Sequence, residues 1–324
     1  MTTAARLRAF VTVADVGSVR AAARRLVVTE SAVSAAIAAL AREVGVPLIE
    51  RDGRGLRLTS SGRTYAGYAR TILGLHEEAL AAARGDTDPE RGRVRVAAVT
   101  TAGEHVLPAL LAAFLASHPA VDLQLEVGTS EHVWDLLATH RADLAIAGRP
   151  PQGLDGAIVR AVRPNTLIVV AAPAVAASFE PGRTRWLLRE VGSGTRTTCE
   201  ALFGSWEIDP PRLTLGSNGA VVAAAAAGLG VTLVSRDAVV GQLADGKLVE
   251  VAPPGIPLSR PWHAVTAGQV PASTALLIDH LLHSDEGGGW REPPPRRAAG
   301  SRSRAGSRSS ANPGSPKSST ARGM

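Results

Sequence analysis

The chain has 324 residues, of which 45% are hydrophobic and only 3% aromatic, and it carries a net charge of +6. This length suits two domains of ordinary size, with cores built from Ala, Val and Leu. A single cysteine, Cys199, excludes internal disulfides, and residues 1–10 lack the apolar run of a signal peptide. We therefore expect a cytoplasmic protein.

The charge is unevenly distributed along the chain. Residues 1–84 carry 12 Arg and 7 acidic side chains, and residues 85–283 carry 15 basic and 19 acidic ones. Residues 284–324 carry 8 basic and 3 acidic side chains. A basic N-terminal region beside an acidic one indicates contact with a polyanion, although a charge imbalance kept for solubility gives the same pattern.

The first 58 residues predict three short helices followed by a hairpin. Ser18 and Thr29 are good N-caps for the second and third helices, and Gly45 ends the third. Two short helices joined by a tight turn have the outline of a helix-turn-helix. Residues 48–59 are extended around a Gly53-Arg54-Gly55 tip, which predicts a basic wing.

A long helix is expected from residue 59 to residue 84, followed by a polar hinge at residues 85–92. The apolar positions of the long helix alternate in steps of three and four. This spacing favours a dimerising coiled coil, although a helix packed on its own domain gives a similar pattern. The candidate dimerisation residues are Tyr65, Tyr68, Ile72, Leu75 and Ala79.

From Arg93 onward, strands and helices alternate, which predicts a parallel sheet covered by helices on its faces. Residues 213–235 contain no charge, but their Ala and Gly content favours a strand–helix–strand passage over a membrane span. Residues 284–324 have almost no apolar content and are expected to be disordered. The strands are expected at residues 94–99, 122–127, 143–147, 167–171, 232–235 and 264–267, and helices at 106–117 and 132–140.

The ordered set of these motifs resembles the LysR-type transcriptional regulators. In the N-terminal part, the match rests on "LRAF", "AAARRL", "AVS", "GVPL" and "LT" followed by Gly62. Beyond the long helix it rests on "GRVRVAAVTT", "HPAVDLQLEVGTSE", "ADLAIAG", "REVGSGTR" and "AAGLGVTLVS". The last two phrases look most like the branch that regulates sulfur assimilation and carbon fixation.

The resemblance implies an α/β protein with an α-rich N-terminal winged helix-turn-helix and a C-terminal two-lobed, periplasmic-binding-protein-like α/β domain. It also implies a homodimer that assembles to a homotetramer, promoter DNA as a partner, a small effector, and no cofactor. The expected parts are a DNA-binding domain at 1–58, a linker and dimerisation helix at 59–84, a hinge at 85–92, an effector-binding domain at 93–283 with lobe I at about 93–162 and 268–283 and lobe II at about 163–267, and a disordered basic tail at 284–324.

The third helix departs from the family where DNA would be read. Glu30 stands where the family usually has Gln, and Ala35 and Ala36 remove long side chains from the groove-facing surface. Either the specificity is altered or base readout is weak, with Arg contacts to phosphate supplying most of the affinity. A ligand-binding protein with weakened DNA recognition is therefore the alternative. The candidate DNA-binding residues are Ser18, Thr29, Glu30, Ser31, Ser34, Arg51, Arg54 and Arg57.

Polar turns at strand and helix ends predict an effector site, because open α/β sheets bind ligands at the carboxyl ends of their strands. Hydroxyls and free N–H groups at helix N-termini suit an anion, although capping alone would explain each of these residues. An aromatic or aliphatic effector held by Leu and Val stays open. The candidate effector-binding residues are Thr100, Thr101, Thr129, Ser130, Ser193, Gly194, Thr195 and Asn218.

We expect no enzymatic activity, because the chain contains none of the motifs G-x-S-x-G, H-E-x-x-H, G-x-x-x-x-G-K and G-x-G-x-x-G. Cys199 near the effector site would suit a redox sensor, but a single helical cysteine usually packs in a core. His280 and His283 lie at helical spacing without a third ligand, so no metal site is expected.

Overall fold

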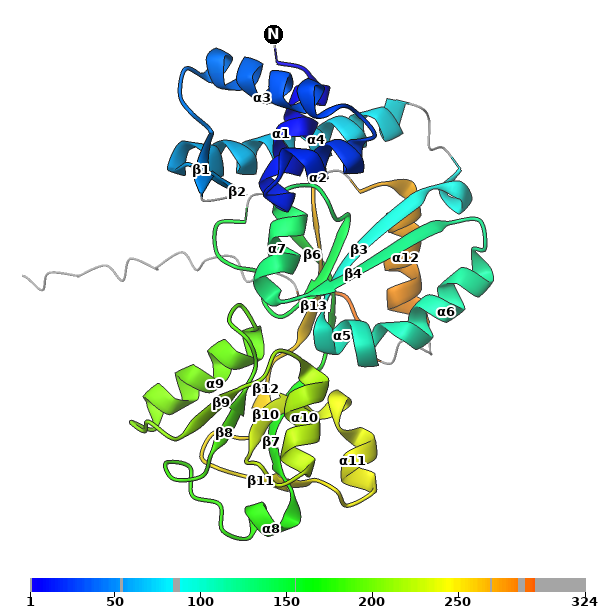
Figure 1. The fold of residues 1–324 in the computed structure, drawn as a ribbon. Helices are drawn as coiled ribbons and strands as arrows, with labels where there is room; N and C mark the ends of the chain where they lie inside the picture. Colours follow the sequence, from blue (N-terminus) through cyan, green and yellow to red (C-terminus); the bar gives the residue numbers. More distant parts are fainter. Residues whose placement is uncertain are drawn as a thin grey trace, which may run out of the picture. The chain divides into compact units, whose positions relative to one another are not determined.

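The computed structural model describes residues 2–52, 55–83, 88–154, 156–268, 270–284 and 289–294. Within these ranges, the chain forms an N-terminal helical domain, a long helix and two α/β lobes (Figure 1). None of the helices in this part of the chain combines the length and apolar character that a membrane crossing requires.

The N-terminal domain is the predicted winged helix-turn-helix. Thr3, Ser18 and Thr29 each accept a hydrogen bond from the backbone N–H three residues later, and so fix where the three helices begin. Gly17 and Gly45 adopt the left-handed conformation that ends the first and third. The elements are α1 (Ala4–Val16), α2 (Val19–Leu26), α3 (Glu30–Val44), β1 (Ile49–Asp52) and β2 (Gly55–Leu58).

The long helix α4 (Ser60–Ala83) follows the wing. Its buried residues Ala66 and Ala69 join a core that Leu7, Phe10 and Leu40 contribute from the DNA-binding domain. Residue 84 and residues 85–87 of the predicted hinge lie outside the described ranges, and the rest of the hinge contains η1 (Pro89–Arg91), capped by Asp88.

Lobe I contains a five-stranded sheet in the order β4-β3-β5-β13-β6. β3 runs parallel to β4 and β5, as the alternating pattern predicts, whereas β13 is antiparallel to both of its neighbours. The strands and helices of this lobe are β3 (Arg93–Val99), α5 (Thr100–His105), α6 (Leu107–Ser117), β4 (Asp122–Gly128), α7 (Ser130–Ala138), β5 (Leu144–Ala147), β6 (Ala157–Arg163), β13 (Trp262–Ala267) and α12 (Ala272–His283).

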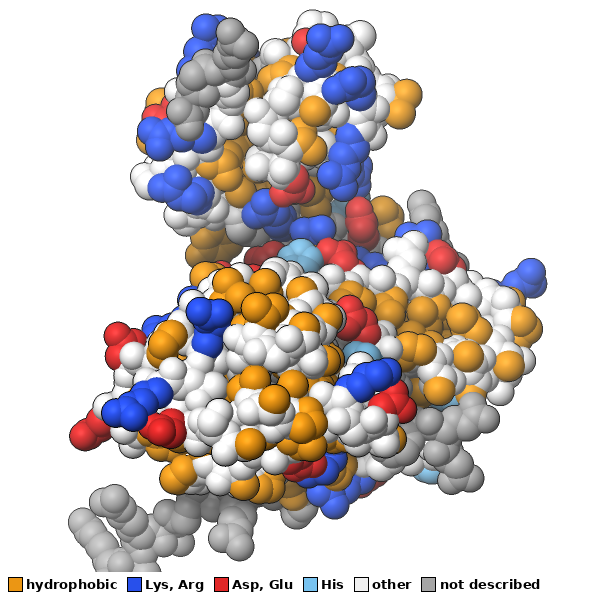
Figure 2. Space-filling model, turned by 60° about the horizontal axis from the view of Figure 1, so that its bottom comes forward, with side chains coloured by type: hydrophobic (Ala, Val, Ile, Leu, Met, Phe, Trp, Pro, Cys, Tyr) orange, Lys and Arg blue, Asp and Glu red, His pale blue; other side chains and the backbone are white. Residues whose placement is uncertain are grey.

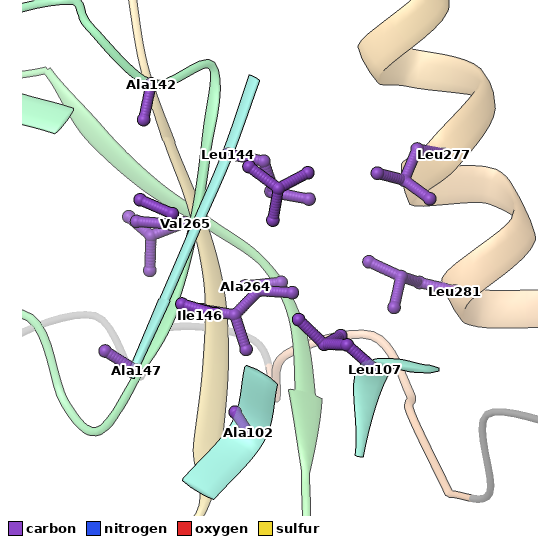
Figure 3. Packing of buried hydrophobic residues seen from close by; sticks show 14 of the residues in the cluster. Ala102, Leu107, Ala142, Leu144, Ile146, Ala147, Ala264, Val265, Leu277 and Leu281 are labelled. Atoms are coloured by element: carbon purple, nitrogen blue, oxygen red, sulfur yellow. The ribbon is translucent and has the colours of Figure 1, made fainter. Parts of the chain in front are cut away.

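The core of lobe I lies between this sheet and its helices. Leu277 and Leu281 of α12 point toward Leu144, Ile146 and Ala264 on the central strands (Figure 3). All five side chains are almost completely buried. Because aliphatic side chains supply this core, the scarcity of aromatic residues does not weaken it.

The main sheet of lobe II is antiparallel, whereas the sequence predicted a parallel sheet. Strand β7 is the centre of its main sheet, and β10, β11 and β12 all pair with it antiparallel. The uncharged stretch 213–235 is the predicted strand–helix–strand passage. The elements of this lobe are β7 (Thr166–Ala171), α8 (Pro173–Ala176), β8 (Trp186–Leu188), α9 (Gly194–Ser205), β9 (Arg212–Thr214), α10 (Asn218–Ala226), β10 (Thr232–Ser235), η2 (Arg236–Ala238), α11 (Val240–Ala244), β11 (Val249–Val251) and β12 (Leu258–Ser259).

The second boundary between the lobes was placed too late in the sequence. Residues 262–267 were expected in lobe II, but they form β13 at the heart of the lobe I sheet. The chain thus returns to lobe I after β12. A local pattern of apolar residues cannot show which of two sheets a strand joins, because both sheets bury similar side chains.

The prediction that everything beyond residue 283 is disordered is wrong for residues 289–294. Trp290 is buried in the lobe I core, and Arg291 exchanges backbone hydrogen bonds with Val162 of β6 at 2.8 and 2.9 Å. One large indole is enough to fix a short segment that otherwise has a disordered composition.

We expect Trp290→Ala to lower the free energy of unfolding by about 3 kcal/mol or more, because it leaves a large cavity in lobe I. Trp290→Phe should keep most of the stability, since the indole Nε1 has no hydrogen-bond partner to lose within the described structure. Urea denaturation measures the free energy of unfolding of both variants. Equal stability of Trp290→Ala and the unmodified protein would show that the segment does not contribute to the core.

Candidate functional sites

The exposed face of α3 is small and weakly polar. Val33 and Leu40 point into the domain, and the residues left exposed toward its N-terminus are Glu30, Ser31, Ala32, Ser34 and Ala35. The two serines and the Glu30 carboxylate can form hydrogen bonds to base edges, while the alanines can contact thymine methyl groups.

Several predicted DNA-binding residues also have local partners. The Ser18 hydroxyl accepts from the Ala21 N–H at 3.3 Å, and the Thr29 hydroxyl accepts from the Ala32 N–H at 3.2 Å. Both are therefore helix caps, which can position a helix on DNA without reading a base. Glu30 is exposed, with its carboxylate 4.0 Å from Arg20.

Arginines are the dominant charges on this domain, and Figure 2 shows them spread over its surface with few carboxylates between them. In the wing, Arg57 pairs with Glu50 at 3.1 Å, whereas Arg51 is exposed without an ion-pair partner among the described residues. Arg54 of the predicted tip lies outside the described residues. Arg24 and Arg25, exposed in the last turn of α2, add two cations that our sequence-based site omitted.

An apolar stripe runs along α4. Tyr68, Ile72 and Leu75 are 68%, 51% and 45% exposed, and Ala79 is exposed as well. Tyr65 is the exception among the predicted dimerisation residues, because its ring packs on Phe10 within the same chain, with 5.7 Å between the ring centroids. The stripe therefore begins one helical turn later than predicted.

The predicted effector-binding turns converge on one cleft between the two lobes. Three of its walls are the starts of helices: α5 follows β3, α7 follows β4, and α9 follows the loop after β8. Seven of the eight predicted residues line it, namely Thr100, Thr101, Thr129, Ser130, Ser193, Gly194 and Thr195.

Hydroxyl groups organise the helix starts around the cleft. Thr129 caps α7 by accepting from the His132 N–H at 3.3 Å, and Ser193 caps α9 by accepting from the Arg196 N–H. The Ser130 and Thr195 hydroxyls have no hydrogen bond within the described residues, and both line the cleft. The first turns of α7 and α9 therefore present N–H donors and two free hydroxyls to a ligand.

Asn218 was wrongly placed in the lining. It is buried at the start of α10, where its side-chain oxygen accepts from Arg189 Nη1 at 3.4 Å. It can thus act on the cleft only through Arg189. The sequence shows a polar residue at a helix start but not the arginine that lies between it and the ligand.

Five lining residues were missed, namely Val99, Gly128, Arg189, Arg260 and Trp262. Arg189 crosses from lobe II, and its Nη2 donates to the Thr100 hydroxyl at 3.3 Å. The same guanidinium makes two bonds of 2.7 and 2.6 Å to the Glu190 carboxylate. Burial raises the pKa of Glu190, but hydrogen bonds and the charge of Arg189 outweigh it and lower the pKa below its ordinary value.

Arg260 lies in the short segment between β12 and β13, where the chain returns from lobe II to lobe I. Its backbone is held by Asn165 on both sides, since its N–H donates to the Asn165 carbonyl and its carbonyl accepts from the Asn165 amide, at 2.9 and 2.8 Å. Burial lowers the pKa of Arg260, and it lowers the pKa of His263 as well. An arginine remains charged despite such a shift.

Three further side chains named from the sequence, Cys199, His280 and His283, do not line the cleft. Burial raises the pKa of the Cys199 thiol to about 12, which makes it an unreactive core residue rather than a redox sensor. The described residues contain no group of three side chains suited to a metal ion around His280 and His283.

Comparison with known families gives two matches that together span most of the chain. Residues 4–63 match the bacterial regulatory helix-turn-helix protein, lysR family, and residues 87–285 match the LysR substrate binding domain.

Individual relatives agree with these matches. The chain is 36% identical to the HTH-type transcriptional regulator CfxR of Cupriavidus necator, over 87% of this chain and 92% of the relative. It is 33% identical to the RuBisCO operon transcriptional regulator of Acidithiobacillus ferrooxidans, over 87% and 94%. The regulatory domain of CcmR from Synechocystis, solved in complex with 2-PG, is 28% identical with a TM-score of 0.53, over 59% of this chain and 95% of that domain.

Proposed function

The chain belongs to the LysR family of bacterial transcriptional regulators, and we propose that a small anionic effector, bound between its two lobes, modulates its binding to promoter DNA. The family match supports DNA binding, and the relatives support regulation rather than catalysis. Two relatives are regulators of a RuBisCO operon, which agrees with the carbon-fixation half of the branch expected from the sequence. A cytoplasmic location follows from DNA as the partner.

One observation carries the effector proposal: hydrogen-bond donors from α5, α7 and α9 face one cleft together with a guanidinium that has no carboxylate partner there. Such dispersed donors can replace the hydration shell of an anion. The complex of CcmR with 2-PG shows that a regulatory domain of this fold accepts a small ligand of that kind. A purely apolar effector would leave these donors without partners.

We propose that the DNA-binding surface consists of the exposed face of α3 with the wing arginines and the α2 arginines. Ser31 and Ser34 supply the side-chain donors and acceptors for base edges. Arg24, Arg25 and Arg51 lie where they can contact phosphates, and such contacts set affinity more than specificity. The alternative function, ligand binding without DNA recognition, would need a surface that has lost these cations.

We expect Arg51→Ala to weaken binding to every duplex by several-fold and to flatten the slope of log affinity against log salt by about one unit, because one phosphate contact is lost. Arg183→Ala is the matched control, since Arg183 is 85% exposed in lobe II, far along the chain. Fluorescence anisotropy at several salt concentrations measures the affinity and its salt dependence for both variants. An unchanged slope for Arg51→Ala would remove the wing from the DNA-binding surface.

Dimerisation is proposed to occur through the exposed stripe of α4, with a tetramer formed from two such dimers. A double substitution of Ile72 and Leu75 to Asp places carboxylates in that seam, which costs several kcal/mol if they stay unpaired. We expect a smaller oligomer by light scattering after gel filtration. Val240→Asp, at a site 60% exposed in lobe II, should keep the original mass. A double variant of unchanged mass would contradict the assignment.

Effector binding has its own test with 2-PG as the probe. A ligand at a hundredfold excess over its Kd stabilises the folded state by about 2.7 kcal/mol, so 2-PG should raise the Tm of the full-length protein. Thr195→Ala should reduce the shift, because it removes a lining hydroxyl without breaking an internal hydrogen bond. Ser205→Ala, at the far end of α9, should not. Stabilisation by neutral compounds only would contradict an anionic effector.

A further inference from the structure

The guanidinium of Arg260 lies between two glycines that belong to different lobes. A methyl group at Gly194, the first residue of α9, would be 2.6 Å from Arg260 Nη2 and 2.7 Å from the Ser130 hydroxyl. A methyl group at Gly148, just after β5, would be 3.2 Å from the same nitrogen. The two glycines thus leave room for the guanidinium. Groups from lobe I, from lobe II and from the segment between β12 and β13 meet here within a few ångströms.

The charges around the cleft are unequal. Glu190 neutralises Arg189 through two short hydrogen bonds. Arg260 has no carboxylate within ion-pair distance among the described residues, and the remaining lining residues are uncharged. Arg260 therefore supplies the net positive charge of the cleft, in a position where burial has already removed part of its hydration.

We propose that Arg260 is the specificity-determining residue of this site and selects an effector with a doubly charged sulfate or phosphoryl group over a monocarboxylate or a neutral compound. This inference rests on the anionic effector proposed above and names its chemical class. The attraction to one fixed charge grows in proportion to the charge of the ligand, and it is stronger away from bulk water.

Geometry favours the same class of ligand. A tetrahedral oxyanion directs its oxygens away from one plane, so that it can meet Arg260, the Ser130 hydroxyl and the start of α9 together. A carboxylate has two oxygens in one plane and satisfies fewer of these donors. Arg260 lies in the segment between β12 and β13, Ser130 belongs to lobe I, and α9 belongs to lobe II. A tetrahedral group bound by these three donors would therefore also link both lobes.

The test is isothermal titration of the full-length protein with sodium sulfate, inorganic phosphate, 2-PG and sodium acetate, at ionic strength held constant with sodium chloride. We expect Arg260→Gln to weaken binding of the tetrahedral anions about 10- to 100-fold, the range for lost hydrogen bonds to a charged group, and to affect acetate less. Arg260→Lys should keep the preference for double charge. Arg236→Gln, whose arginine pairs with Glu250 outside the cleft, is the control. Comparing the affinities for sulfate and phosphate with the affinity for 2-PG shows whether the site binds a free oxyanion or a phosphoryl group carried by a larger molecule.

Stability without ligand separates a binding role from a structural one. Arg260 lacks a counter-ion, so Arg260→Gln should unfold at the same temperature as the unmodified protein or higher. Arg189→Gln breaks an ion pair and should unfold at a lower temperature. A lower unfolding temperature for Arg260→Gln would assign it a structural role and overturn the proposal.

Three binding results would also overturn it, each in a distinguishable way. Unchanged affinity of Arg260→Gln for sulfate and 2-PG, with weakened binding in Thr195→Ala, would leave the cleft in place and remove Arg260 from it. Equal losses for acetate and sulfate would remove the selectivity for double charge. No binding of any anion by the unmodified protein would contradict the anionic effector itself.

Discussion

The geometry of the effector cleft depends on one buried amide, that of Asn165. Its backbone carbonyl and side-chain nitrogen hold the backbone of Arg260, while its side-chain oxygen accepts from Ser235 at 2.6 Å. The two segments that connect the lobes, between β6 and β7 and between β12 and β13, are thereby tied to each other and to the end of β10 (Figure 1). Arg163 adds an ion pair with Asp237 at 2.7 Å beside this point. A buried amide whose oxygen and nitrogen both form hydrogen bonds is costly to disturb, so the backbone of Arg260 is held in place by the fold.

Around this fixed point, the protein uses its two cleft arginines differently. Arg189 is held by Glu190 and reaches Thr100 of the other lobe, so it contributes to the structure when no ligand is bound. Arg260 has room between two glycines but no counter-ion among the described residues. An uncompensated cation attracts an anion more strongly than one that is already paired. In the role proposed for Arg260, this difference would let a cleft lined mostly by neutral hydroxyls distinguish ligands by charge.

The DNA-binding domain shows a similar division between structure and recognition. Its helix caps, Ser18 and Thr29, are engaged by backbone N–H groups, and apart from Glu30 the exposed side chains at the start of α3 are small. In the proposed DNA-binding surface, most of the affinity comes from arginines that contact phosphates irrespective of sequence. The exposed stripe that starts at Tyr68 is the surface proposed for dimerisation.

Local sequence determined the helix-turn-helix, the first parallel strands and seven of the cleft residues, because caps, glycines and apolar periodicity act over a few residues. Tertiary structure alone decided which sheet β13 joins, the antiparallel pairing of lobe II and the burial of Trp290. It also turned Tyr65 inward against Phe10 and placed Asn218 behind Arg189. Arg260 could not be found from sequence, because a single arginine in the segment between β12 and β13 carries no local pattern. Its proposed role as an anion-binding residue depends on Gly148 and Gly194, which lie 112 and 66 residues away along the chain and meet it only after both lobes have folded.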